Sequence, residues 1–280
     1  MEIVSADSRQ VYRYMDIGTD KPTSSRLESV PHHCIDIRDP DEFFSAGEYG
    51  QLARRIIEDI FHRNRIPIVV GGSGLYIRAL VDGVFSGNAR DINIRERLRE
   101  EAEEGGLDVL YQRLSRIDPD AVQKIHAHDM RRIIRALEVY ELTGEPISRV
   151  QKDRTEAADF TPLFWSLRWD RDVIYQRIEE RVDRMIESGL VDEVKGLRKM
   201  GYGRQNNSLD SVGYKEIFDF LDGQLPLDEA INLIKQNTRR FAKKQMSWFR
   251  RDARIKWIDV QEPVNWGELA DTVLRSVDDS

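Results

Sequence analysis

The sequence contains one cysteine and no long apolar run, and both scarcities exclude classes of protein. Cys34 has no partner for an internal disulfide, which is typical of proteins kept in a reducing cytosol. No stretch reaches the roughly 18 consecutive apolar residues that a membrane-spanning helix requires. The first residues, from Met1, also lack the basic and then apolar segments of a signal peptide. We therefore expect a cytoplasmic protein with no membrane partner.

The chain also lacks an overall positive charge and a complete set of zinc ligands. Its 43 Lys and Arg are outnumbered by 50 Asp and Glu, giving a net charge of −7, which argues against a generally nucleic-acid-binding surface. "PHHC" (31–34) and the pair His126 and His128 complete no four-ligand site, and there is no second cysteine. These spacings exclude structural zinc.

Positive charge is nevertheless concentrated in one place. Residues 237–256, "NTRRFAKKQMSWFRRDARIK", contain eight Lys or Arg and one acid, Asp252. In an acidic protein, such a segment is more typical of a localised polyanion site than of a surface that binds anions everywhere.

The order of patterns predicts an α/β protein with a parallel sheet. "IPIVVGGSGLYIRALVDG" (66–83) is a short apolar run without alternation, a glycine loop and a helical pattern, as in a strand covered on both faces and followed by a helix. Residues 3–5 also resemble a buried strand, 45–64 an amphipathic helix with Ser45 as N-cap, and 161–170 a strand that returns to the sheet. We predict a core of residues 1–87 and 156–280, with an all-helical insertion at 88–155.

Within that insertion, we expect helix breaks at Gly105-Gly106 and at Asp118-Pro119, and a helix that ends at Gly144 with Pro146 just beyond. The core should contain two further long helices, at 172–188 and near 228–252.

The loop Gly71-Gly72-Ser73-Gly74 has two interpretations. Successive backbone N–H groups before a helix can bind an anion, and glycine lets the backbone approach it closely. The same residues can simply form a tight turn between strand and helix that needs a positive φ. Taken alone, the loop favours the tight turn slightly.

Three groups of arginine and lysine have similar alternatives. Arg177, Arg181 and Arg184 share one helix face, where nearby acids favour a solvated ion-pair face over a phosphate-binding row. In the helix near 237–251, Trp248 and Phe249 lie among cations, which favours binding of a polyanion with bases over simple docking of an apolar stripe. Arg131, Arg132 and Arg135 would add a second basic patch on the insertion.

Seven segments, in order along the chain, resemble one family. They are "SADSRQVYRYMDIGTDKP", "VPHHCIDI", "VGGSGLYIRAL", "RRIIRALEVYELTG", "RIEERVDRMIESGLVDEV", "SVGYKE" and "TRRFAKKQMSWFRRD". Together they resemble tRNA dimethylallyltransferases, also called tRNA isopentenyltransferases, from Ile3 to about Asp259.

This resemblance implies an activity and its partners. The family transfers a dimethylallyl group from dimethylallyl diphosphate to N6 of the adenine 3′-adjacent to the anticodon (position 37), forming N6-isopentenyladenosine. Its core is P-loop-kinase-like, of the nucleotide- and ATP-binding kind, and its helical insertion helps to hold the tRNA anticodon stem-loop. The base is flipped into a channel that the diphosphate enters from the other end. Mg²⁺ is the implied cofactor, and a monomer is expected because one basic groove per chain suffices.

The resemblance also assigns residues. Asp7 matches the general base that hydrogen-bonds the adenine amine, and Arg181 matches the arginine that holds the leaving diphosphate. Gly71, Gly72 and Ser73 would assist Arg181, and no metal ligand is assigned. The segments that match the family's tRNA contacts contain Asp7, Ser8, Arg9, Gln10, Ser73, Arg95, Arg131, Arg132, Ile133, Ile134, Arg135, Asp210, Ser211, Val212, Gly213, Tyr214, Lys215, Lys243, Lys244, Gln245, Met246, Ser247, Trp248, Phe249 and Arg250.

One departure from the family pattern limits the expected activity. The family has a glycine-rich P-loop ending in Gly-Lys-Thr or Gly-Lys-Ser, about twenty residues upstream of the equivalent of Asp7, and this sequence contains no G-x-x-x-x-G-K-[ST]. One alternative is an enzyme of this family whose N-terminal segment has been clipped from the given sequence. The other is a tRNA-binding remnant of the family with impaired catalysis. A small-molecule P-loop kinase is a third hypothesis, against which the basic patches and the absent P-loop lysine both argue.

Overall fold

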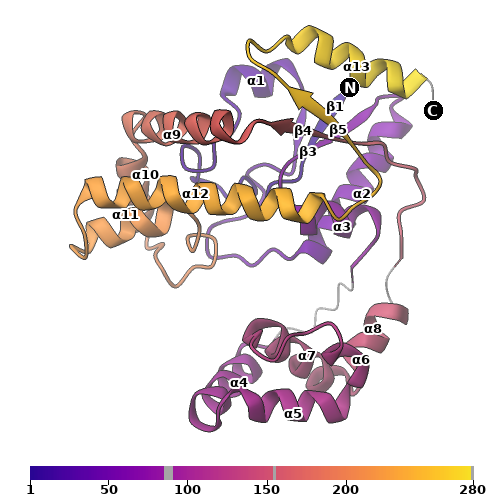
Figure 1. Cartoon of the computed structure of the whole chain (residues 1–280), viewed down its shortest axis with the longest axis vertical. Helices are drawn as coiled ribbons and strands as arrows, with labels where there is room; N and C mark the ends of the chain where they lie inside the picture. Colours follow the sequence, from indigo (N-terminus) through magenta and orange to yellow (C-terminus); the bar gives the residue numbers. More distant parts are fainter. Residues whose placement is uncertain (85–90, 154–155, 279–280) are drawn as a thin grey trace. The chain divides into compact units, whose positions relative to one another are not determined.

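The computed structural model describes residues 1–84, 91–153 and 156–278, which form two compact units (Figure 1). The first unit comprises Met1–Phe44, Leu52–Ile77 and Asp159–Ser280, and the second comprises Ser45–Gln51 and Arg78–Ala158. Both predicted boundaries of the insertion, at 87/88 and at 155/156, fall on residues outside the described ranges or directly beside them.

A three-stranded parallel sheet forms the first part of the first unit. Strand β1 (Glu2–Ser5) lies in the middle, between β2 (His32–His33) and β3 (Pro67–Val70). Ile3 is paired with His32 on one side and with Ile68 on the other. The parallel sheet predicted from the sequence is therefore confirmed.

The expected covering of the third strand on both faces is wrong for this structure. In β3 the side chains of Ile68 and Val70 are 38% and 51% exposed, whereas Val4 on the neighbouring β1 is fully buried. An apolar run without alternation indicates that a strand can be covered on both faces, but it does not determine which elements are present to cover it.

The strand predicted at 161–170 exists but does not return to the first sheet. Strand β4 (Phe164–Trp169) pairs in parallel with β5 (Ile255–Val260), and these two strands form a sheet of their own among the described residues. Strand β5 was not predicted. Pairing between strands about ninety residues apart leaves no local signal, so the sequence pattern could not identify the partner.

The first unit also contains helices that follow these strands along the chain. The helices after β4 are α9 (Arg171–Glu187), α10 (Leu190–Lys199), α11 (Tyr214–Leu221) and α12 (Leu227–Phe249). Helix α12 packs against both α9 and α11, where Ile178, Phe218 and Ile234 are buried. Two more helices are α1 (Ser24–Ser29) and α13 (Trp266–Asp278).

Two helices, α2 (Ala46–His62) and α3 (Gly74–Val81), contain residues of both units. Ser45 caps α2 as predicted, because its Oγ accepts a hydrogen bond from the Glu48 N–H at 3.1 Å while the Glu48 carboxylate accepts one from the Ser45 N–H at 2.8 Å.

The second unit contains only helices between residues 91 and 153. They are α4 (Ile92–Gly105), α5 (Leu107–Ile117), α6 (Pro119–Val122), α7 (Met130–Thr143) and α8 (Ile147–Asp153). The predicted breaks are confirmed, and α7 ends where Gly144 adopts a left-handed φ of 72°. A separate apolar core holds this unit together, with Leu98, Leu110, Leu114, Ile133 and Leu137 all fully buried.

In the part of the chain that is described, no helix has the length and apolar character needed to cross a membrane.

Candidate active site

The loop directly after β1 holds Asp7 at the carboxyl end of a central strand, where parallel α/β sheets commonly bind ligands. One carboxylate oxygen, Oδ1, accepts hydrogen bonds from the Arg9 N–H at 2.7 Å and from the Gln10 N–H at 3.2 Å. The other oxygen, Oδ2, has no hydrogen-bond donor among the described residues. Asp7 is half-buried, so it is held in place by the backbone and still has one oxygen available to an incoming donor.

The glycine loop at 71–74 lies against this Asp7 loop. The Ser73 Oγ accepts a hydrogen bond from the Ser8 N–H at 2.9 Å, and the Ser73 N–H donates to the Ala6 carbonyl at 3.1 Å. A Cβ at Gly71 would lie 2.4 Å from the Ala6 backbone. Gly71 is therefore required for the close approach of two loops.

Helix α12 contacts the same glycine loop. The Gln245 Nε2 donates to the Gly72 carbonyl at 3.0 Å, and a Cβ at Gly74 would lie 2.1 Å from the indole nitrogen of Trp248. These contacts account for the glycines by the close approach of neighbouring atoms. The positive φ expected for a tight turn is wrong, because Gly71, Gly72 and Gly74 all lack it.

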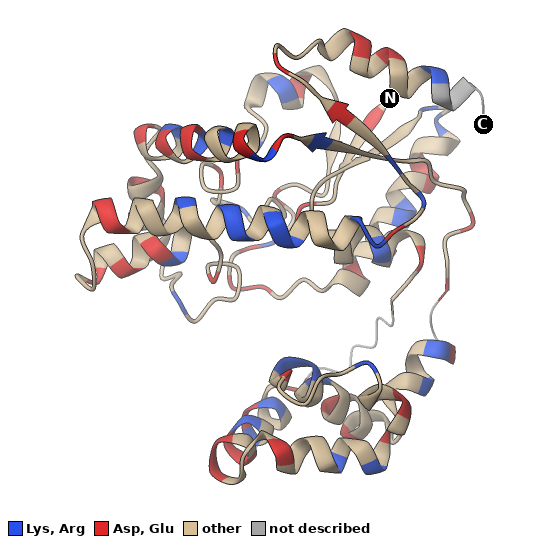
Figure 2. Ribbon diagram, viewed as in Figure 1, with Lys and Arg blue, Asp and Glu red and all other residues tan. Residues whose placement is uncertain are grey.

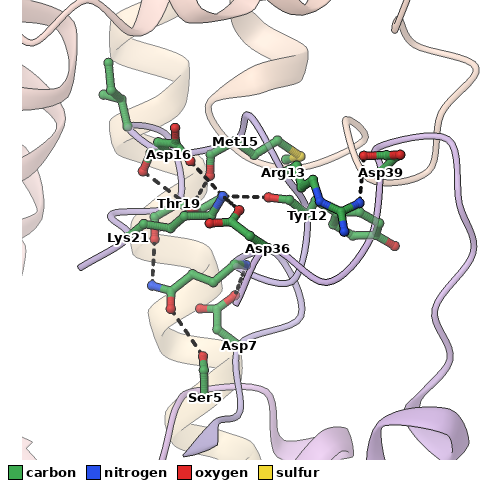
Figure 3. Close-up of polar contacts among 12 residues, drawn as sticks. Ser5, Asp7, Tyr12, Arg13, Met15, Asp16, Thr19, Lys21, Asp36 and Asp39 are labelled. Atoms are coloured by element: carbon green, nitrogen blue, oxygen red, sulfur yellow. Dashed lines mark hydrogen bonds and ion pairs between the residues drawn. The ribbon is translucent and has the colours of Figure 1, made fainter. Parts of the chain in front are cut away.

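Gln10 joins the Asp7 loop to a turn at residues 16–20 (Figure 3). Its Nε2 donates to the carbonyls of Thr19 and Asp20, each at 3.2 Å, and its Oε1 accepts from the Ser5 hydroxyl at 3.2 Å. The side chain of Gln10 is thus fully engaged, and its backbone N–H is bound by Asp7. Figure 3 shows Asp7 and Ser5 on one side of this network and Thr19 on the other.

Arg181 on α9 reaches the same turn. Its Nε lies 3.3 Å from Oδ2 of Asp20, in an ion pair that does not have hydrogen-bond geometry, so this buried nitrogen has no hydrogen-bond partner among the described residues. The side chains of Arg181 and Asp20 are 42% and 66% exposed, so the pair is open to solvent. An arginine in this state can still donate to an anion.

The other two arginines of the row do not join Arg181. The guanidinium of Arg177 lies over the Trp169 ring at 4.5 Å and pairs with Glu262 at 3.2 Å. Arg184 forms an exposed pair with Glu180 on its own helix. The ion-pair interpretation therefore holds for Arg177 and Arg184, and Arg181 is the member that differs.

Helix α12 presents a set of cations without partners. Lys243, Lys244 and Arg250, which we call the α12 basic surface, are exposed and have no ion-pair partner in the described part of the chain. Arg239, by contrast, pairs with Glu179 of α9 at 2.7 Å. Figure 2 shows that Lys and Arg gather along the middle of α12, while acidic residues lie at its start.

Aromatic side chains accompany these cations. Phe241 is 56% exposed and Trp248 is 41% exposed, so neither completes an apolar stripe with the buried Ile234. The combination of exposed rings and unpaired cations is suited to nucleic acid, since bases stack on rings while phosphates meet cations. The remaining predicted contacts on this helix are the half-buried Met246 and Phe249 and the exposed Ser247.

The segment at 210–215 is only partly accessible. Asp210 is exposed, and Ser211, Val212 and Lys215 are half-buried. Gly213 and Tyr214 are buried, and the Tyr214 hydroxyl donates to the Glu193 carboxylate at 2.6 Å. The Arg9 guanidinium binds the chain just before this segment, donating to the carbonyls of Asn207 and Ser208 at 2.9 and 3.0 Å. Tyr214 and Arg9 thus have structural partners within the protein.

In the second unit, two predicted tRNA-contact arginines share one buried acid. The fully buried Glu138 accepts from Nε and Nη2 of Arg95, at 2.6 and 2.8 Å, and from Arg135 at 2.7 Å. The Asp91 N–H adds a fourth bond at 3.0 Å. Burial raises the pKa of Glu138, but these hydrogen bonds outweigh it and the net shift is downward, which keeps the carboxylate charged.

The predicted contact segment on α7 has a surface part and a core part. Arg131 is exposed and has no ion-pair partner among the described residues, while Arg132 pairs with Asp129 at 3.3 Å. Ile133 and Ile134 are buried in the core of the unit, so their side chains are not available to a ligand. Contact by this segment would depend on its arginines.

Three acidic residues of these networks were not predicted from the sequence. Glu193, Asp20 and Glu138 each hold a predicted site residue or its loop, through contacts between distant segments. No spacing rule links such pairs. A buried acid on an otherwise apolar helix face, as at Glu138, is the one local signal that could have indicated a partner.

Known proteins similar to this chain support one family. The profile of the IPP transferase family matches residues 10–252. The chain is 51% identical to the tRNA dimethylallyltransferase of Carboxydothermus hydrogenoformans over 260 residues, covering 92% of this chain and 83% of that protein. It is 49% identical to the corresponding protein of Desulforudis audaxviator over 261 residues, covering 93% and 84%.

Solved structures agree. The tRNA isopentenylpyrophosphate transferase of Bacillus halodurans superposes with a TM-score of 0.72 at 41% identity, covering 99% of this chain and 87% of that one. A eukaryotic dimethylallyltransferase, described as acting on tRNA, superposes with a TM-score of 0.76 at 29% identity, covering 92% and 67%.

Proposed function

The chain belongs to the IPP transferase family, the tRNA dimethylallyltransferases, and from this premise we propose how it acts. It transfers a dimethylallyl group from dimethylallyl diphosphate to N6 of the adenine 3′-adjacent to the anticodon of a tRNA. The observation that carries the proposal is Asp7, a carboxylate with one oxygen fixed by two backbone N–H groups and the other open to a donor.

We assign the role of general base to Asp7. The N6 nitrogen forms a bond to C1 of the dimethylallyl group, while the bond from C1 to the diphosphate oxygen breaks and the diphosphate leaves with the electron pair. The proton from N6 passes to the open Oδ2 of Asp7. Since Oδ1 is bound to Arg9 and Gln10, the carboxylate keeps its orientation during the transfer.

Arg181 is assigned to the diphosphate. Negative charge grows on the leaving oxygen as the bond breaks, and a guanidinium fixed nearby stabilises that charge more than it stabilises the ground state. Support comes from its buried Nε without a hydrogen-bond partner and from its loose pairing with Asp20, which a diphosphate can replace. We also propose that Gly71, Gly72 and Ser73 border this anion, although the N–H of Ser73 is already bonded to Ala6.

We propose that each unit contributes a basic surface for the anticodon stem-loop. The α12 basic surface of the first unit has unpaired cations beside exposed rings, and the second unit presents Arg131 on α7. A monomer in the cytoplasm is the simplest arrangement, because one chain provides both surfaces.

The described residues contain no cluster of three or more side chains suited to a metal ion. Mg²⁺ is commonly held by substrate phosphates and water together with one or two carboxylates. We therefore propose that Mg²⁺, which neutralises phosphate charge, arrives with the diphosphate, and we assign it no resident ligand.

The test is a prenyl-transfer assay with dimethylallyl diphosphate and an unmodified tRNA that carries adenine beside the anticodon. We expect N6-isopentenyladenosine at that position, detected by mass spectrometry of the digested tRNA, and none with a tRNA that carries guanine there. A chain that bound the tRNA and formed no product would instead be the tRNA-binding remnant of the family.

A further inference from the structure

Glu193 at the start of α10 accepts hydrogen bonds from two separate segments of the chain. Its Oε2 accepts from the N–H groups of Asp16 and Ile17, at 3.0 and 2.7 Å, and its Oε1 accepts from the Gly18 N–H at 3.2 Å. The Tyr214 hydroxyl adds a bond to Oε1 at 2.6 Å. Three successive backbone N–H groups on one carboxylate fix the direction of a turn.

Tyr214 reinforces this arrangement by packing. It is fully buried, and a Cβ at Gly18 would lie 2.5 Å from its ring. Burial and the adjacent carboxylate of Glu193 raise the pKa of Tyr214 well above its usual value, which keeps its hydroxyl protonated as a donor. Glu193 and Tyr214 therefore hold the turn at 16–20 from two sides.

The turn at 16–20 also binds Gln10, which contacts the proposed base Asp7. The carbonyls of Thr19 and Asp20 bind the Gln10 side chain, and the Gln10 N–H binds Oδ1 of Asp7. Hydrogen bonds, joined by the backbone of the turn and by the Gln10 residue itself, thus connect Glu193 to Asp7. The turn also carries the Asp20 side chain that meets Arg181.

We propose that Glu193 is a positioning residue for the transfer reaction, acting through the turn at 16–20 and Gln10 to orient Asp7. The inference rests on the proposed function. It adds a residue on a helix outside the loops that contain Asp7 and Ser73, whose carboxylate is bonded to the turn and to Tyr214. A misplacement of about 1 Å at a reacting group can cost about a hundredfold in rate, so a distant brace of this kind has a measurable effect.

The test compares Glu193→Gln with two matched variants. An amide has one acceptor end where the carboxylate has two, so we expect Glu193→Gln to lower kcat about tenfold or more, with the Kd for tRNA within about twofold. Tyr214→Phe removes one of the four bonds and should lower kcat less. Asp192→Asn alters the adjacent acid, whose exposed pair is with Lys195, and should leave kcat unchanged.

A double-variant comparison separates positioning from general destabilisation. If Glu193 acts through Gln10, Glu193→Gln should lower kcat only slightly further in a Gln10→Ala background. An equal loss in both backgrounds would overturn the proposal. So would a normal kcat for Glu193→Gln.

Amide hydrogen exchange tests the role of Glu193 without measuring activity. A failure of the proposed function would be seen separately, because the wild-type chain would then form no product in the prenyl-transfer assay. We expect faster exchange in Glu193→Gln at the N–H groups of residues 16–18 and also at Gln10, with no change in Asp192→Asn. Faster exchange confined to 16–18 would show that Glu193 anchors the turn alone, which contradicts the proposal.

Discussion

At Asp7 the two carboxylate oxygens have different environments, and the difference is what the chemistry requires. An acid with both oxygens free would rotate, and an acid with every lone pair engaged by donors would have none left for the proton. Because the backbone N–H groups of Arg9 and Gln10 bind Oδ1 alone, they fix the orientation of Oδ2 and leave it free to accept a proton. The sequence resemblance assigned the role to Asp7, but only the structure distinguishes its two oxygens.

We expect Asp7→Asn to lower kcat for prenyl transfer by about 10²- to 10⁴-fold, the range for removal of a positioned general base. The amide can replace the carboxylate as acceptor of the two N–H bonds, so the loop should keep its shape and tRNA binding should change little. Rates are measured under single-turnover conditions, with Asp41→Asn at an exposed position as control. A rate for Asp7→Asn close to wild type would contradict the assignment.

Arg181 and Arg184 lie one turn apart on α9 and provide a direct comparison. Arg184 has an exposed pair with Glu180, whereas Arg181 has a buried Nε with no hydrogen-bond partner among the described residues. We expect Arg181→Ala to lower kcat/KM for dimethylallyl diphosphate by about 10²- to 10³-fold, as for loss of one donor to a developing anion. Arg184→Ala should stay within about threefold, and equal losses in the two variants would refute a special role for Arg181.

Among the elements, helix boundaries were the most predictable from sequence, and strand partners the least. Helix α7 ends at Gly144 because a left-handed residue there costs glycine little, and that signal is local. The pairing of β4 with β5 joins two segments far apart in the chain, so it could not be predicted. The shape of the turn at 16–20 could likewise not be predicted from the sequence, because it depends on hydrogen bonds to Glu193 of α10.

Strand β1 carries an acid whose titration should affect stability. Hydrogen bonds from Arg63, which directly follows α2, and from His33 of β2 lower the pKa of Glu2 from 4.5 to about 2. Because the folded state has the lower pKa, the carboxylate stabilises the fold fully above pH 4.5, and this contribution is lost as the pH falls toward 2.

We therefore expect Glu2→Gln to lower the urea midpoint at pH 7, and the gap from wild type to narrow steadily between pH 4.5 and pH 3. Glu58→Gln, at an exposed position on α2, is the control and should show no such pH-dependent gap. A gap for Glu2→Gln that stayed constant across this range would show that the lowered pKa of Glu2 does not contribute to stability.

For the whole molecule, the arrangement within each unit explains which predicted contacts remain available. In the first unit Lys243, Lys244 and Arg250 lack ion-pair partners among the described residues, while Arg239 is neutralised by Glu179. In the second unit Glu138 engages Arg95 and Arg135 and Asp129 pairs with Arg132. Among the predicted tRNA contacts there, this leaves Arg131 as the exposed cation without an ion-pair partner in the described part of the chain. Sequence counts of positive charge could not make this distinction, because they do not show which cations are already paired.

The two units predict a specific pattern of tRNA binding. If both basic surfaces contact the same stem-loop, Lys243→Ala with Lys244→Ala should weaken binding, Arg131→Ala should weaken it separately, and the free-energy losses should add within about 0.5 kcal/mol. Each lost phosphate contact should also reduce the slope of log Kd against log salt by about one. Filter binding at several salt concentrations measures both quantities, with the paired Lys195→Ala as control. A slope unchanged by Arg131→Ala would show that Arg131 meets no phosphate, because a cation that meets a phosphate must release counterions when it binds.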